Sequence, residues 1–177
     1  MNIALFYGIV FALGNIVLTL VGFFLGFQTD KMAQGRWFGF LSFVVMIVVL
    51  WIGIRAAREE AKDKSLSYGR GVGIGTLIAL YGGIIGAIYG FIHFTYINPN
   101  FADYVVDAAR QQWIAKGMSD SQMDAAEKFT RMFTKPAIST VMGIIVTPII
   151  GAVISLVLAA FLKRKPVVDL EATPPAA

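Results

Sequence analysis

The chain has 177 residues, enough for one domain. Hydrophobic residues make up 57% and charged residues 15%, whereas about a quarter of a typical soluble domain is charged, so much of the apolar surface must face lipid. The net charge of +4 is modest and the basic residues flank apolar blocks, which argues against nucleic acid as a partner. The lack of cysteine excludes disulfides and thiolate metal sites, and one histidine excludes a multi-histidine metal site.

Four long apolar blocks without a charged residue predict four transmembrane spans, over residues 3–27, 37–54, 71–97 and 136–162. A bilayer core about 30 Å thick needs roughly 20 apolar residues in a helix, and the blocks meet or approach that length. No Lys or Arg precedes the first block and no small-residue cleavage site follows it, so we interpret it as a span and not as a signal peptide. The predicted fold class is all-α, an integral membrane four-helix bundle.

The distribution of basic residues predicts the orientation of the spans. Five Lys or Arg between the second and third spans and three after the fourth lie on one side, together with the N-terminus, because the number of spans is even. The other side holds seven, five of them in a long loop that also carries five acidic residues. Basic residues packed against helix ends favour the cytoplasmic side, so we expect both termini in the cytoplasm.

The long loop between the third and fourth spans carries the signals of two helices. The pair Asn98-Pro99 is typical of a helix N-cap followed by proline at the first helical position. Gly117 is a plausible stop for this helix. Ser119 and Gln122 then have the spacing of a capping box, which predicts the start of a second helix.

Residues 98–135 are therefore expected to form an amphipathic helical hairpin outside the membrane. Such a hairpin caps the bundle or lies on the lipid headgroups, and the alternative is that it docks a partner protein. Residues 1–165 make up the membrane domain. The tail, residues 166–177, contains three prolines and is expected to be disordered.

Small residues recur at every fourth position of the last two spans. Residues four apart share one helix face, and glycine there lets neighbouring backbones approach. We predict helix-packing roles within the bundle for Gly82, Gly86 and Gly90 of the third span and for Gly143 and Gly151 of the fourth. The alternative is that these faces contact a second copy of the chain or a partner.

Asn15 and His93 form the candidate polar site within the spans. Asn15 is expected to make an interhelical hydrogen bond. His93 lies near the end of the third span among aromatic residues, where a structural role at the membrane interface is expected. None of the spans contains Asp, Glu, Lys or Arg, and the serines in them have no His or Lys at a telling spacing, so we predict no catalytic, cofactor-binding or metal-binding residue and no enzyme activity.

Several segments together carry a resemblance to a known family. These are Ser-Tyr-Gly-Arg at 67–70, Tyr-Ile-Asn-Pro-Asn-Phe at 96–101, Gly-Met-Ser-Asp at 117–120 and Lys-Arg-Lys at 163–165. With them the chain, over about residues 3–165, resembles a bacterial family catalogued as domain of unknown function 4199, small four-span proteins frequent in Bacteroidota. The resemblance implies the same topology and an inner-membrane location, and it implies no activity and no functional residues.

We therefore expect a polytopic inner-membrane protein that acts as a non-enzymatic subunit or scaffold. Its expected partners are the lipid bilayer and either a second copy of the chain or another membrane protein. The alternative is a small-solute transporter or channel that works as an oligomer. The lack of charged residues within the spans counts against that alternative, because ion and proton pathways usually contain them.

Overall fold

The computed structural model describes residues 2–165, which contain six α-helices. They are α1 (Ile3–Phe24), α2 (Phe38–Glu60), α3 (Tyr68–Ile92), α4 (Phe101–Ala115), α5 (Asp120–Thr134) and α6 (Pro136–Leu162). A 3₁₀-helix, Gln34–Trp37, precedes α2, and a π-helix, His93–Ile97, continues α3. No strand occurs in the described residues, so the predicted all-α class is confirmed. The predicted disordered tail, 166–177, lies outside the described residues.

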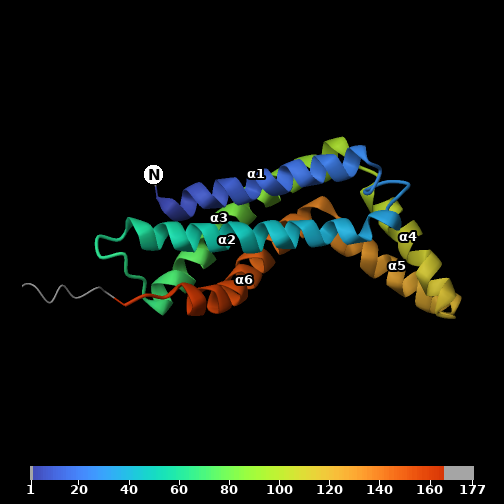
Figure 1. The fold of residues 1–177 in the computed structure, drawn as a ribbon. Helices are drawn as coiled ribbons and strands as arrows, with labels where there is room; N and C mark the ends of the chain where they lie inside the picture. Colours follow the sequence, from blue (N-terminus) through green and yellow to red (C-terminus); the bar gives the residue numbers. More distant parts are fainter. Residues whose placement is uncertain (1, 166–177) are drawn as a thin grey trace, which may run out of the picture.

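Four helical segments are long and apolar enough to cross a membrane, which confirms the predicted number of spans. They are α1, α2, α6 and α3 together with its π-helical extension. Figure 1 shows them running along the molecule, with the α4–α5 hairpin projecting at one end. We call this the hairpin end. The N-terminus and the loop of residues 61–67 lie at the opposite end, which we call the loop end (Figure 1).

The helix boundaries differ from the predicted spans at three places. Helix α1 ends at Phe24 because the chain turns at Gly26, whose φ of +82° is left-handed and suits glycine. Helix α2 continues past the apolar block to Glu60, because the Arg, Ala and Glu residues that follow the block are good helix formers. Helix α3 begins earlier, at Tyr68, where the side chain of Ser67 caps it. The fourth span has the predicted bounds.

Helices α3 and α6 pack through a ladder of small residues, which we call the small-residue seam. Each step of four residues forward along α3 is matched by a step of four residues back along α6. The pairs are Gly71–Ala159, Gly75–Ser155, Ala79–Gly151, Gly83–Thr147 and Ala87–Gly143. A Cβ added at Gly75 would collide with the Ser155 side chain, and one at Gly151 would collide with Ala79. The backbones can therefore lie this close only because the side chains are small.

The small residues of α3 have three different surroundings: some contact α6 in the seam, some contact α1, and some face open space. Gly82 faces α1, where an added Cβ would lie 3.0 Å from the carbonyl oxygen of Gly8. At Gly86 and Gly90 an added Cβ would meet nothing within 4 Å, so the prediction that these two are packing contacts is wrong. The spacing correctly indicated a small-residue surface, but α3 carries such residues on more than one face, and spacing alone does not tell which face meets α6.

The tightly packed core lies in the half of the bundle toward the loop end. It contains Leu66 of the loop before α3 and buried residues of all four spans: Ala4, Phe11, Met46, Val49, Leu50, Ile54, Ile78, Ala79, Leu158 and Leu162. Helices α2 and α6 both contribute residues to this core. Helix α6 is bent in Figure 1 and contains Pro148, which lacks the N–H needed for an intrahelical bond. Toward the hairpin end, α2 and α6 separate.

The hairpin has the predicted form, with a corrected start. Gly117 adopts a φ of +70° after α4, and Ser119 and Gln122 form the predicted capping box. The two helices are joined by an ion pair between Arg131 and Asp103, 2.6 Å apart. Asn98 does not cap α4, which begins at Phe101, and its side chain has another role described below.

The seam predicts that two neighbouring glycines of α3 respond oppositely to alanine. Gly75→Ala should lower the unfolding free energy by roughly 1–3 kcal/mol, because its methyl group overpacks the contact with Ser155. Gly73→Ala should be neutral or stabilising, since its Cβ meets nothing within 4 Å and alanine favours helix by about 1 kcal/mol. Thermal unfolding of the purified variants in detergent measures both. Equal unfolding midpoints for the two variants would contradict the seam.

Candidate functional site

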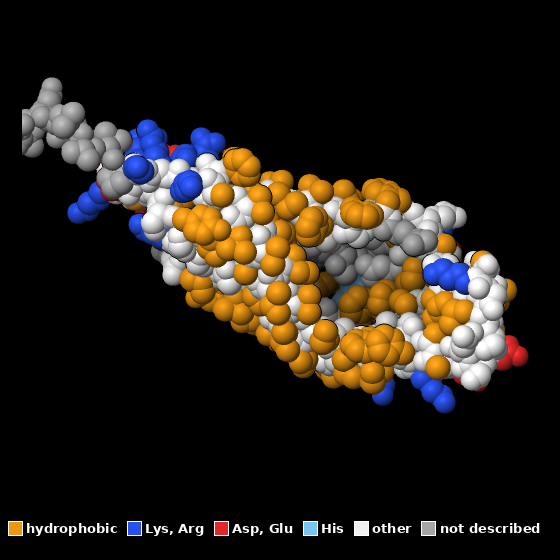
Figure 2. Space-filling view, turned by 90° about the horizontal axis from the view of Figure 1, so that it is seen from below, with side chains coloured by type: hydrophobic (Ala, Val, Ile, Leu, Met, Phe, Trp, Pro, Cys, Tyr) orange, Lys and Arg blue, Asp and Glu red, His pale blue; other side chains and the backbone are white. Residues whose placement is uncertain are grey.

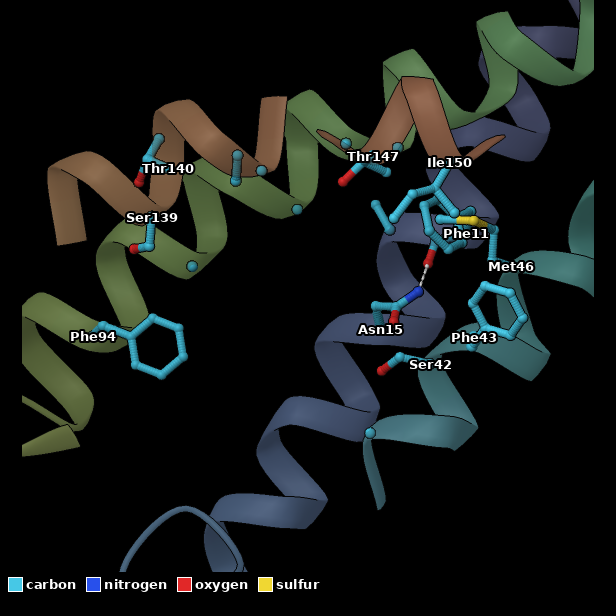
Figure 3. A pocket seen from close by; sticks show the side chains of 18 residues that line it. Phe11, Asn15, Ser42, Phe43, Met46, Phe94, Ser139, Thr140, Thr147 and Ile150 are labelled. Carbon is cyan, nitrogen blue, oxygen red and sulfur yellow. Dashed lines mark hydrogen bonds between the residues drawn. The ribbon is translucent and has the colours of Figure 1, made fainter. Parts of the chain in front are cut away.

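A cavity of ≈ 440 Å³ lies between the four spans, on the hairpin side of the core. Figure 3 shows its walls, with side chains from α1, α2, α3 and α6 pointing toward a common space. Its 18 lining residues are Phe11, Ala12, Asn15, Gly39, Ser42, Phe43, Met46, Gly82, Gly83, Gly86, Ala87, Gly90, Phe94, Ser139, Thr140, Gly143, Thr147 and Ile150. Two glycines of α3 with open space at their Cβ positions, Gly86 and Gly90, thus face this cavity.

A second chamber of ≈ 340 Å³ continues the cavity toward the hairpin end. The two chambers share Gly39, Ser42 and Phe94 as lining residues. The ring of Phe94 lies 4.4 Å from that of Phe101, at the start of the hairpin. The cavity therefore extends from the core to the level at which the spans end.

The lining of the main chamber is uncharged and offers few free donors. The side-chain amide of Asn15 donates to the carbonyl oxygen of Phe11 at 3.0 Å (Figure 3). The hydroxyls of Ser139 and Thr140 donate to the carbonyl oxygen of Pro136. These groups bond within their own helices, whereas the hydroxyls of Ser42 and Thr147 have no partner among the described residues, so a ligand meets mainly apolar surface with a few hydroxyl groups. The prediction that Asn15 bonds to another helix is wrong.

The cavity reaches the molecular surface through an apolar face. Figure 2 shows a hollow beside the hairpin that is bordered largely by hydrophobic side chains. Both α2 and α6 carry exposed hydrophobic residues in this part of the bundle, among them Phe40 and Phe43 on α2 and Val141 and Ile145 on α6. These helices are long and apolar enough to cross a membrane, so the opening faces the depth of the lipid tails.

Gln28 is the centre of a second polar cluster, which we call the Gln28 hub. Its side-chain nitrogen donates to the carbonyl oxygen of Thr19 at 2.8 Å, and its side-chain oxygen lies 2.9 Å from Nε2 of His93. Its backbone carbonyl accepts from the side chain of Asn98 at 3.1 Å. The hydroxyl of Tyr89 lies 3.1 Å from Nδ1 of His93. The hub thus ties the loop after α1 to the end of α3.

The hydrogen bonds of the hub determine the tautomer of His93. Because the amide nitrogen of Gln28 donates to Thr19, its oxygen faces His93 and can only accept. Nε2 of His93 must therefore carry the hydrogen, and Nδ1 accepts from the hydroxyl of Tyr89. His93 is 0% exposed and the Phe23 ring meets it edge-on, so we assign a neutral imidazole with both nitrogens satisfied.

The structure separates the two residues of the predicted polar site. Asn15 lines the cavity, whereas His93 is buried in the hub, near the end of the third span. Sequence reasoning missed Gln28, because nothing in a single sequence distinguishes a loop glutamine that bonds across the fold. Asn98 was recognised as a polar residue at a boundary, but it is 3% exposed and bonds to Gln28.

Residues 2–165 contain no group of three or more His, Asp or Glu side chains arranged to hold a metal ion. Two of the five carboxylates of the hairpin, Asp103 and Glu127, bond to Arg131. These contacts hold the pKa of Arg131 above its usual value. The cavity and the Gln28 hub are thus the two sites that the fold builds within its spans.

Comparison with known proteins gives one match. A family model described as a protein of unknown function (DUF4199) matches residues 6–164, which is nearly the whole chain. No curated protein matches, and no solved structure matches.

The Gln28 hub predicts that removing its amide destabilises the hairpin end. Gln28→Leu should lower the unfolding free energy by roughly 1–3 kcal/mol, because the N–H of His93 stays buried without an acceptor. The matched control is Gln34→Leu, at an exposed glutamine of the same loop region, which should change little. Thermal unfolding and hydrogen exchange of the amides of residues 25–33 measure the effect. Equal behaviour of the two variants would show that the hub is dispensable.

Proposed function

The chain belongs to DUF4199, a family of proteins of unknown function, and from its cavity we propose that it is a non-enzymatic membrane subunit that binds the apolar chain of a membrane amphiphile. The observation that carries the proposal is the uncharged cavity of ≈ 440 Å³ that opens between α2 and α6. Its volume falls within the range of about 300–1,000 Å³ typical of ligand pockets. A ligand that enters from the lipid tails needs no charged side chain to bind it.

The volume argues against a transmembrane helix as the occupant. One turn of a helix about 10 Å across and 5.4 Å long fills roughly 400 Å³. The main chamber therefore holds about one turn, whereas a helix that crosses the bilayer needs about 20 residues. A flexible hydrocarbon chain fits a compact cavity of this kind better than a rigid rod does.

The shape of the cavity favours binding over conduction. Toward the loop end the core closes it, with Leu50, Ile54 and Ile78 fully buried there. The wall bears no charged side chain, whereas ion and proton pathways through membranes usually contain them. These features support a binding protein over the alternative of a small-solute transporter or channel.

We also propose that the protein lies in the bacterial inner membrane with its loop end in the cytoplasm. The loop end carries eight Lys or Arg and three Asp or Glu, in residues 55–70 and 163–165. The hairpin end carries seven basic and six acidic residues, in residues 28–37 and 98–135. The excess of positive charge at the loop end supports the cytoplasmic assignment.

The proposed function predicts that a bulky residue at Gly86 excludes the ligand. Gly86→Leu should weaken binding of a fluorescent phosphatidylcholine roughly tenfold, or about 1.4 kcal/mol, because the new side chain occupies the cavity. The fold should tolerate it, since an added Cβ meets nothing within 4 Å. Fluorescence titration of the purified protein in mild detergent measures the affinity.

Gly73→Leu is the matched control, because its Cβ position on α3 is equally open but lies outside the cavity. This variant should bind the fluorescent lipid as the unchanged protein does. Unchanged binding by Gly86→Leu would refute the proposed site, and so would equal weakening by both variants, which would indicate a general effect of leucine on α3.

The proposed orientation predicts which positions an impermeant reagent can reach. The chain has no cysteine, so a single introduced one is labelled without background. Ala177→Cys should react with an impermeant maleimide only after the inner membrane is opened. Ser121→Cys, at an exposed hairpin position, should react in intact cells. The reverse pattern would invert the orientation.

A further inference from the structure

At the loop end, an isolated antiparallel β-bridge joins the segment before α3 to the segment after α6. The N–H of Leu66 donates to the carbonyl oxygen of Arg164 at 2.9 Å, and the N–H of Arg164 donates to the carbonyl oxygen of Leu66 at 3.0 Å. Leu66 precedes Gly71 by as many residues as Arg164 follows Ala159, the seam partner of Gly71. The bridge therefore continues the pairing of the small-residue seam past the helix ends. It therefore fixes the position of three consecutive basic residues that follow the last span.

The bridge places two lysines on the outer face of the paired segments. Leu66 is 1% exposed and packs into the core. Neighbours of a residue in extended chain point to the opposite side, so Ser67 and the residues facing it across the bridge point outward. Ser67 is extended, and Lys163, Arg164 and Lys165 are all exposed. Lys163 and Lys165 thus lie at the surface, one on each side of the bridged Arg164.

The two segments enclose a pocket of ≈ 470 Å³. Its lining residues are Ser65, Leu66, Ser67, Tyr68, Lys163, Arg164 and Lys165. Three of the seven carry positive charge and none carries negative charge. Figure 2 shows basic side chains gathered at this end of the molecule, so an anion approaching it meets a positive surface.

One carboxylate, Asp63, belongs to the adjoining loop, and it already has partners. It accepts a hydrogen bond from the N–H of Ser65 at 3.1 Å. The side chain of Ser65 and then its backbone hold the pKa of Asp63 below its usual value. Lys64 and Arg70 flank this loop, so the surroundings of the pocket remain positive on balance.

The pocket also lies at the depth where lipid headgroups are found. Lys163 directly follows Leu162, the last residue of the fourth span, and Tyr68 is the first residue of the third. Aromatic residues with a polar tip, such as Tyr68, are typical of the membrane–water boundary. Basic pockets between spans on the cytoplasmic side suit anionic headgroups.

From these observations we propose that the bridge-held pocket binds the phosphate group of an anionic phospholipid, with Lys163 and Lys165 as its main contacts. The site lies at the opposite end of the spans from the opening of the cavity, so it goes beyond the proposed ligand binding and does not depend on it; only its cytoplasmic side rests on the proposed orientation. A lipid is favoured over free phosphate because the acyl chains of a lipid whose phosphate occupies the pocket can lie along the exposed apolar surface of α6.

The test compares two charge-matched double variants of the full chain in mild detergent. Lys163→Gln with Lys165→Gln removes the proposed contacts, and Lys116→Gln with Lys128→Gln removes the same charge from exposed positions of the hairpin. Native mass spectrometry measures the binding of phosphatidylglycerol, with phosphatidylcholine and inorganic phosphate as separate arms. We expect the first pair to bind phosphatidylglycerol roughly tenfold more weakly and the second pair to bind it normally.

Each remaining outcome decides against the proposal. Equal weakening by both pairs would indicate general electrostatic attraction, and no weakening by the first pair would remove the lysines from the site. Phosphatidylcholine bound as tightly as phosphatidylglycerol would exclude selectivity for an anionic lipid, and inorganic phosphate bound as tightly would make the site one for the free anion. Repeating the titration on Gly86→Leu separates the two sites, because that variant should keep phosphatidylglycerol binding even where cavity binding is lost.

Discussion

The close approach of α3 and α6 through the small-residue seam is the constraint on which the other features depend. Because Gly75 and Gly151 have no side chain, the two backbones touch along most of the membrane thickness. The other two spans then pack on α3 from its remaining face, where Gly82 lies against α1. Helices α2 and α6 share the core, and the cavity lies beside it, lined by all four spans. The same pairing carries on to the β-bridge, which positions the basic segment.

The position of a polar residue along the chain does not indicate whether it bonds to another segment. Asn15, in the middle of a span, lines the cavity, and its amide donates to a carbonyl oxygen of its own helix. Gln28, outside the predicted spans, makes the contacts that hold the hairpin end together. The proposed ligand binding therefore depends on the cavity, whereas the Gln28 hub stabilises the hairpin end. Substitutions at the two places should have separable effects.

Much of the architecture could be predicted from the sequence because bilayer thickness and charge cost act on each helix alone. The four spans, the fourth span's bounds and the capping box at Ser119 follow from such local rules. Contacts between helices do not: α3 has small residues on several faces, so Gly86 was assigned to packing although it lines the cavity. The role of Asn98 was misjudged for the same reason, since its partner, Gln28, lies 70 residues away in the chain.

A repeating seam has a property that an ordinary interdigitated core lacks. Since small residues recur every fourth position on both helices, sliding α6 along α3 by one repeat, roughly 6 Å, would again set small residues against small residues. The seam alone therefore fixes the distance between the two helix axes better than it fixes the position of α6 along α3. The axial position of α6 is fixed instead by contacts outside the seam. These are the two hydrogen bonds between Leu66 and Arg164, and the packing of Leu158 and Leu162 into the same core as Ile78.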